Sequence, residues 1–158
     1  MLGIAFAAVT QRRHDRDSVR PISAIEVDDY EDLLAVRISN VGIGPLTIKE
    51  ILFTAPGQKG AILVNMMPQI DQMWDTFTKD VTGWTIPVGG HVSLLQLTPL
   101  RADTRQSVRR ALAPVTVFIK YTDIYRTPFT YSRDLSFFAR TISSESPLSL
   151  SPRLPHSD

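Results

Sequence analysis

Val115-Thr-Val-Phe-Ile-Lys-Tyr121 is the stretch from which the fold class of this chain is best predicted. Its odd-numbered positions are aliphatic or aromatic, whereas the polar residues Thr116 and Lys120 lie between them. Successive side chains of a β-strand point to opposite faces, so an apolar residue at every second position predicts a strand with one buried face. The same alternation runs from Leu34 to Ser39. A core built from sheets is therefore expected.

Other segments with this period, or with a short apolar run between turn residues, bring the expected strands to about eight. They cover residues 22–27, 34–39, 46–53, 61–64, 81–87, 91–97, 115–121 and 129–137. In the third of these strands the apolar positions change parity between Ile48 and Ile51. One extra residue near Lys49 and Glu50, a β-bulge, would restore the register. Short strands at this spacing are typical of a β-sandwich or a β-barrel.

Two segments depart from the strand pattern and are expected to form short helices. Residues 66–77 carry large apolar side chains at helical spacing, with Asn65 as N-cap and Pro68 in the first turn. In residues 103–112, Asp103 can cap a helix, and Val108, Ala111 and Leu112 form a narrow apolar stripe that stops before Pro114. Many immunoglobulin-like sandwiches place a helix where the chain crosses between sheets. We therefore predict an all-β fold, an immunoglobulin-like antiparallel β-sandwich of roughly seven to nine strands with two short helices and an N-terminal helical segment.

The length of 158 residues, with 43% hydrophobic and 21% charged residues, predicts one folded domain with one core. Strand parity predicts a core made of Val36, Ile38, Ile48, Ile51, Phe53, Trp84, Val117, Ile119, Tyr121, Leu135 and Phe137. Residues 21–142 are expected to form the sandwich. Residues 143–158 are rich in serine and proline and too poor in apolar groups to offset the entropy of ordering, so a disordered tail is expected.

Residues 1–20 combine an apolar run with a basic cluster. Met1–Val9 is apolar, but a helix that spans a membrane needs roughly 20 such residues. The basic residues that follow are Arg12, Arg13, Arg16 and Arg20. One interpretation is the C-terminal half of a transmembrane helix, with the arginines at the cytoplasmic face of the membrane. The other is an amphipathic helix that caps the domain or lies on a surface.

Charge and residue types argue against several classes of site. The net charge is only +1, so bulk charge gives no indication of a nucleic-acid partner. The absence of cysteine excludes disulfides, thiolate metal sites and cysteine nucleophiles. His14, His91 and His156 are scattered, and no nucleophile elbow or paired-histidine motif is present. We therefore predict a protein that is not an enzyme, with no catalytic residue, no metal and no cofactor.

Two further motifs are interpreted as connections between strands. Asn40-Val-Gly-Ile-Gly-Pro45 lacks the third glycine of a dinucleotide-binding loop and precedes a strand, so a tight corner with glycines at positive φ is expected. Residues 26–32 hold five carboxylates with no basic residue among them, at a spacing unlike that of a calcium loop. A solvated hairpin turn is expected there.

Arginines are the candidate binding residues. Near the second expected helix, four arginines and one aspartate, Asp103, give a local charge of +3. The arginines are Arg101, Arg105, Arg109 and Arg110. This is either a solvated helix face or a contact with lipid headgroups or nucleic-acid phosphates. The lack of interleaved aromatic residues disfavours nucleic acid. The candidate contacts with an anionic surface are Arg12, Arg13, Arg16, Arg20, Arg101, Arg105, Arg109 and Arg110.

Three stretches resemble a group of uncharacterised bacterial and phage proteins. They are Arg13-His-Asp-Arg-Asp-Ser-Val-Arg-Pro21, Asn40-Val-Gly-Ile-Gly-Pro45 and Tyr121-Thr-Asp123. The resemblance implies a single N-terminal transmembrane helix, a basic junction and a small immunoglobulin-like sandwich. It implies no catalytic residue.

Two functions follow as expectations. The first is a non-catalytic protein-interaction module tethered at the cytoplasmic face of a membrane, which acts through a protein partner or through self-association. The second is a soluble structural or accessory protein, such as a phage protein, whose N-terminal helix mediates oligomerisation or partner binding. A sensor of a small ligand or nucleotide, with its pocket at one end of the sandwich, is the weaker alternative.

Overall fold

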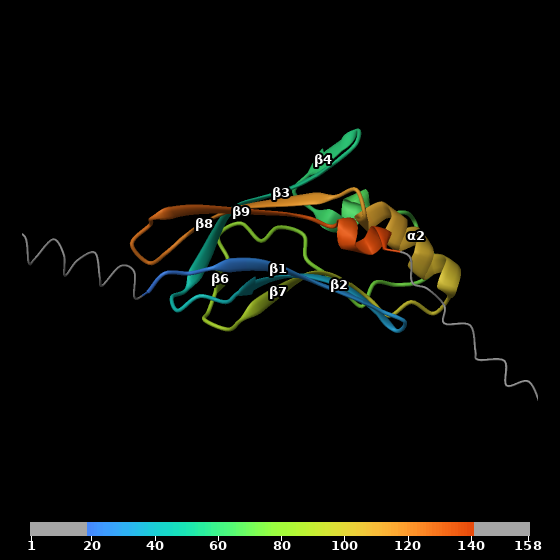
Figure 1. Ribbon diagram of the computed structural model, residues 1–158, viewed down its shortest axis with the longest axis horizontal. Coiled ribbons are helices and arrows are strands. Elements are labelled where there is room, and N and C mark those ends of the chain that lie inside the picture. The colour runs from blue at the N-terminus through green and yellow to red at the C-terminus, as the bar shows by residue number, and fades with distance from the viewer. Residues whose placement is uncertain (1–18, 141–158) are drawn as a thin grey trace, which may run out of the picture.

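Two antiparallel sheets form most of the protein in the computed structural model, which describes residues 19–140. The first sheet has the order β1 (Ser23–Tyr30), β2 (Leu33–Asn40), β7 (His91–Leu97) and β5 (Thr76–Phe77). The second has the order β4 (Gln58–Gly60), β3 (Leu46–Ala55), β8 (Thr116–Thr122) and β9 (Pro128–Asp134), and β6 (Thr85–Ile86) pairs with β3. Figure 1 shows the two sheets as two layers. The predicted all-β antiparallel fold is confirmed.

The expected helix in residues 103–112 is also confirmed. α2 (Ala102–Leu112) connects β7 to β8, and its Val108 and Leu112 are fully buried against the sheets. Figure 1 places α2 at one end of the layers, beside the 3₁₀ helix η2 (Ser136–Ala139) that follows β9. The end of the molecule that carries α2 therefore combines helical segments with the β1–β2 turn, whereas the opposite end consists of loops between strands.

The core lies between the two sheets and largely matches the positions expected from strand parity. All of the predicted core residues are buried except Trp84, which is 49% exposed, and Phe137, which is half-buried. Phe138 is buried instead of Phe137, because the chain has left β9 for the turn of η2 and no longer alternates. Trp84 lies in a tight turn just before β6, where Gly83 has a φ of 84°.

The predicted β-bulge in β3 is present. β3 pairs with β8 in a register that shifts between Ile48 and Glu50, so Ile48 and Ile51 are both buried although their parity differs. β7 also has the predicted bounds.

The predicted helix in residues 66–77 is wrong. A short 3₁₀ helix, η1 (Leu63–Met66), stands where a strand over 61–64 was expected, and the chain then runs irregularly to β5. Met67 has an extended ψ of 153°, as the residue before Pro68 is pushed out of the helical region. Met66, Ile70 and Trp74 still pack against the core from this irregular segment. Of the expected strand over 81–87, only β6 is formed.

The corner between β2 and β3 is tight, as predicted, but for a different reason. Gly42 and Gly44 do not have positive φ values. A Cβ atom on Gly42 would lie 2.3 Å from the backbone nitrogen of Ile22, and one on Gly44 would lie 1.7 Å from the carbonyl oxygen of Val19. These glycines therefore let the segment that leads into β1 pass directly over the corner.

Candidate functional site

Asp29 is the buried centre of a cluster of charges at the end of the molecule that carries α2. Its side chain is fully buried, and its Oδ1 atom accepts a hydrogen bond of 2.6 Å from Nη2 of Arg105. Its Oδ2 atom accepts one of 3.1 Å from Nε of Arg109 and lies 3.4 Å from Nε of Arg140. We call these four residues the Asp29 cluster.

The arginines of the cluster also bind backbone carbonyl groups in two segments, the end of β1 and the residue after η2. Arg105 donates from Nε to the carbonyl oxygen of Tyr30 in β1 at 2.9 Å. Arg140, just after η2, donates from Nη2 to the carbonyl oxygen of Asp29 at 3.0 Å. Arg109 donates from Nη2 to the carbonyl oxygen of Arg140 at 2.7 Å. Because guanidinium groups present several donors in one plane, each arginine joins two segments at once.

These contacts overturn the expectation that residues 26–32 form a solvated turn without basic partners. Asp28 pairs with Arg37, and Asp29 pairs with the arginines of its cluster. Of the five carboxylates, Glu26, Glu31 and Asp32 are exposed, and the last two lie in the turn itself. The partners come from other elements, so they are absent from the local sequence.

The sequence of α2 explains why its arginines point in two directions. Arg105 and Arg109 are four residues apart and therefore share one face of the helix, which turns toward β1. Arg101 pairs instead with Asp103 in the first turn, and both are exposed. A hydrogen bond from the backbone N–H of Thr104, followed by the charge of Arg101, lowers the pKa of Asp103. A carboxylate at this position suits the positive end of the helix dipole.

Two adjoining hollows surround the Asp29 cluster. The larger, of about 820 Å³, has both acidic and basic walls, and its charged lining residues are Asp29, Glu31, Arg101, Arg105 and Arg140. The smaller, of about 540 Å³, lies between α2 and η2, and we call it the arginine groove. It is lined by Arg105, Gln106, Arg109, Arg110, Ala113, Phe138, Ala139 and Arg140, with no carboxylate among them.

The arginines of the groove differ in how far their charges are already neutralised. Arg105 and Arg109 share the single carboxylate of Asp29, and Arg140 also stacks on Phe137, 3.8 Å from the ring centroid. Arg110 is exposed, and its side chain makes no hydrogen bond or ion pair with any residue in the range 19–140. One carboxylate among four guanidinium groups leaves an excess of positive charge, so the groove is suited to bind an anion.

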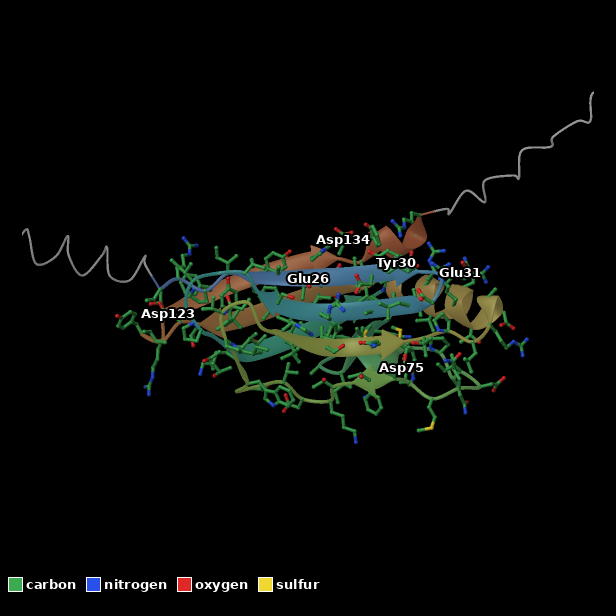
Figure 2. All side chains as sticks on the ribbon, turned by 90° about the horizontal axis from the view of Figure 1, so that it is seen from below. Glu26, Tyr30, Glu31, Asp75, Asp123 and Asp134 are labelled. Carbon is green, nitrogen blue, oxygen red and sulfur yellow. The ribbon has the colours of Figure 1, made fainter. Side chains whose placement is uncertain are left out.

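The predicted anionic-surface residues fall into separate groups. Arg105, Arg109 and Arg110 meet in the arginine groove, and Arg101 lines the neighbouring hollow. Arg20 lies at the opposite end of the sandwich, over the ring of Phe129 at 5.3 Å from its centroid. Figure 2 labels residues at both ends: Asp123 lies at one, and Tyr30 and Glu31 lie at the other, next to α2. Arg12, Arg13 and Arg16 lie outside the described residues.

Sequence reasoning missed Asp29 and Arg140. Asp29 looked like one of five similar carboxylates, and Arg140 stands alone near the expected tail. A signal for Asp29 existed in the parity of β1, because Ile25, Val27 and Asp29 occupy alternate positions and Ile25 and Asp29 are both buried.

Metal clusters and membrane-spanning helices can be checked directly in the described part of the chain. Between residues 19 and 140, no three His, Cys, Asp or Glu residues lie close enough together to hold a metal ion. In the same range no helix has the length and apolar character required to cross a bilayer. The chemistry that the arginine groove offers is charge-assisted hydrogen bonding to an anion.

Comparisons with known proteins add no family. No protein-family model and no curated protein matches the chain. Among solved structures, the chain is similar to the archaellum periplasmic stator protein FlaG from Sulfolobus acidocaldarius, at 11% sequence identity, over 71% of this chain and 100% of that chain, with a TM-score of 0.21. Similarity at this TM-score gives no information about the function of this chain.

Proposed function

We propose that this chain is a non-catalytic protein-interaction module, tethered at the cytoplasmic face of a membrane, that binds an acidic segment of a partner protein in the arginine groove. The observation that carries the proposal is the concentration of four arginines, with no carboxylate, in the lining of a groove of about 540 Å³. Planar guanidinium groups bind carboxylates through paired hydrogen bonds, which gives both affinity and orientation.

Protein carboxylates fit the groove better than nucleic acid does. Base stacking requires exposed aromatic faces, but Phe138 is buried and the ring of Phe137 is already covered by Arg140. Glu31, in the wall of the neighbouring hollow, and Asp103, in the first turn of α2, would repel a long phosphate backbone. A short acidic peptide avoids both.

The position of the groove supports a tether at the other end of the domain. Val19 and Arg20 lie against the β2–β3 corner, and Figure 1 shows this end opposite to α2. The apolar run Met1–Val9 and the basic residues Arg12, Arg13 and Arg16 precede that point in the sequence. Basic residues next to a membrane segment favour the cytoplasmic side. A domain held in this way would present the arginine groove away from the membrane.

We also propose that the sandwich is immunoglobulin-like. The order β1-β2-β7-β5 corresponds to strands A, B, E and D of that fold, and the neighbours β3, β8 and β9 correspond to C, F and G. α2 then occupies the connection between strands E and F. Such sandwiches present their loops at two ends, which suits a module with one end for a tether and one for a partner.

The test is binding of a fluorescently labelled poly-glutamate peptide to the full chain, measured by anisotropy. Arg110→Ala removes an exposed groove arginine outside the Asp29 cluster, so the fold is retained. We expect it to weaken binding about tenfold, the effect of one charge-assisted hydrogen bond. Lys59→Ala is the matched control, because Lys59 is an exposed cation on β4 outside the groove.

Three results would count against this function. They are equal affinities of the two variants, binding of an uncharged poly-glutamine peptide as tight as that of poly-glutamate, and tighter binding of a single-stranded oligonucleotide than of the peptide. Affinity for poly-glutamate should also fall as salt rises, because screening weakens contacts between exposed charges.

A further inference from the structure

Exposed apolar side chains gather at the end of the sandwich opposite to α2. They come from the segment before β1, the β2–β3 corner, the β6–β7 turn and the β8–β9 loop. We call this set the apolar tip; it consists of Ile22, Val41, Ile43, Val88, Ile124 and Tyr125, each between 48% and 63% exposed. Figure 1 shows these connections at the same end of the two layers.

Backbone hydrogen bonds join the loops of the apolar tip. Val41 donates to the carbonyl oxygen of Ile22 at 2.9 Å, and Ile43 donates to that of Arg20 at 3.1 Å. Two hydrogen bonds of 3.0 Å join Asn40 to the β6–β7 turn. The N–H of Gly89 donates to the carbonyl oxygen of Asn40, and the N–H of Asn40 donates to the carbonyl oxygen of Gly90. The segment before β1, the β2–β3 corner and the β6–β7 turn are therefore joined to one another. The β8–β9 loop lies next to them, because Arg20 in the first of these segments covers the ring of Phe129 at the start of β9.

The loops of the apolar tip are held rigidly, so their apolar side chains cannot fold back into the core. The buried Asn40 side chain donates to the carbonyl oxygens of Gly44 and Ile86, at 2.8 and 3.1 Å, and accepts from the Gly42 N–H. Asp123 fixes the β8–β9 loop in the same way, because its Oδ1 accepts from the N–H groups of Tyr125 and Thr127, each at 2.8 Å.

In the four described segments that form the apolar tip, the exposed charged residues are all basic. In residues 19–22, 41–45, 87–90 and 123–127 the acidic residue is Asp123, which is buried and already accepts two hydrogen bonds. Arg20 and Arg126 are exposed in the same segments. Aliphatic and tyrosine side chains flanked by arginines, without an exposed carboxylate, are the chemistry of surfaces that sit in the headgroup region of an anionic bilayer.

We propose that the apolar tip docks onto the headgroup region of a bilayer that contains anionic lipid. The inference rests on the tether proposed above and adds a second contact with the same membrane. Only residues 10–18 separate the apolar run Met1–Val9 from Val19, which lies against the β2–β3 corner, so the tip stays close to the membrane once the run is inserted. Docking fixes the orientation of the domain and points the arginine groove into the cytoplasm.

A second copy of the chain is a poorer occupant of this surface. A symmetric contact brings the same patch of both copies together, so Arg20 and Arg126 would face their counterparts without an exposed carboxylate in these segments to neutralise them. An anionic bilayer supplies the negative charge that the apolar tip lacks.

The test uses single cysteine labels, since the native chain has no cysteine. The full chain with Ile43→Cys carries an environment-sensitive fluorophore at the apolar tip. Leu100→Cys is the matched control, because Leu100 is exposed and lines the hollow near α2. Both proteins are mixed with phosphatidylcholine vesicles with or without phosphatidylglycerol, and with brominated lipid as quencher.

We expect both labelled proteins to float with anionic vesicles. Only the label at position 43 should shift to shorter wavelength and lose intensity to the lipid-borne quencher. Ile124→Ser, on a different loop of the tip, should reduce that quenching, whereas Met73→Ser, an exposed apolar residue elsewhere, should not.

The opposing outcomes separate the two proposals. Flotation of both proteins without quenching at position 43, or with equal quenching at positions 43 and 100, overturns docking of the tip and leaves the tether intact. Failure of both proteins to float overturns the tether, and docking with it. A shift of the label at position 43 without vesicles, together with a doubled mass in light scattering, assigns the tip to self-association and overturns docking.

Discussion

Gly44 has no side chain because the backbone of Val19 occupies the place of a Cβ atom. That atom would lie 1.7 Å from the carbonyl oxygen of Val19, far inside van der Waals contact, and the obstacle is backbone that cannot rotate away. The absence of a side chain at Gly44 thus allows the segment that leads into β1, residues 19–22, to cross the β2–β3 corner. Ile43, next to it, is held outward in the apolar tip by this crossing.

Gly44→Ala should therefore destabilise the protein by about 1–3 kcal/mol or more, the cost of overpacking a fixed site. Urea unfolding of the full chain measures the change. Gly60→Ala is the matched control, because a Cβ atom there meets nothing within 4 Å and its φ is not positive. A midpoint for Gly44→Ala equal to that of Gly60→Ala would show that the lead-in segment does not cross the corner.

At the scale of elements, the Asp29 cluster ties α2 and η2 to the end of β1. A buried ion cluster need not stabilise a fold relative to apolar side chains, but removal of one partner leaves a charge without compensation. Here a single carboxylate serves Arg105, Arg109 and Arg140. The loss of that carboxylate would leave neighbouring cations facing one another.

Asp29→Asn should cost about 3–5 kcal/mol of unfolding free energy, because the amide keeps the shape of the side chain but not its charge. Glu31→Gln, two residues away and exposed, should change stability by less than about 0.5 kcal/mol. Thermal unfolding followed by circular dichroism measures both. If the two variants unfold alike, the arginines do not depend on Asp29 for compensation.

At the scale of the whole molecule, the sandwich separates two surfaces of different chemistry. The arginine groove lies at the end formed by α2 and η2, and the apolar tip lies at the end formed by the β2–β3, β6–β7 and β8–β9 connections (Figure 1). The sheets between them form one packed core. Substitutions at sites this far apart, with no shared partners, behave independently.

A substitution in one surface should therefore leave binding at the other surface unchanged. Arg110→Ala should weaken poly-glutamate binding and leave lipid quenching of the label at position 43 unchanged, whereas Ile124→Ser should do the reverse. The double variant should show both losses with the same sizes. Anisotropy and quenching on the same four proteins measure this, and a loss in the double variant that exceeds the single losses would show that the ends are coupled.

The elements that were predicted well have signals that are local in sequence. The alternation in β8 and β2, the parity change in β3 and the apolar stripe of α2 each reflect the geometry of one element, and the structure confirms them. The helix expected in residues 66–77 shows the limit of such signals. Its apolar residues do reach the core, but they do so from an irregular segment. Pro68 keeps the preceding residue, Met67, out of the helical conformation, although the apolar residues have helical spacing.

Side-chain periodicity was sufficient to predict the all-β class, most strand positions, the bulge and most of the core, because this periodicity follows directly from backbone geometry. The arginine groove and the apolar tip could be recognised only once the three-dimensional arrangement of the elements was known. Asp29 and Arg140 are 111 residues apart, and Asp29 and Arg105 are 76 apart. No periodicity connects residues at such separations; they meet only because the sheets stack and bring α2 and η2 to the end of β1.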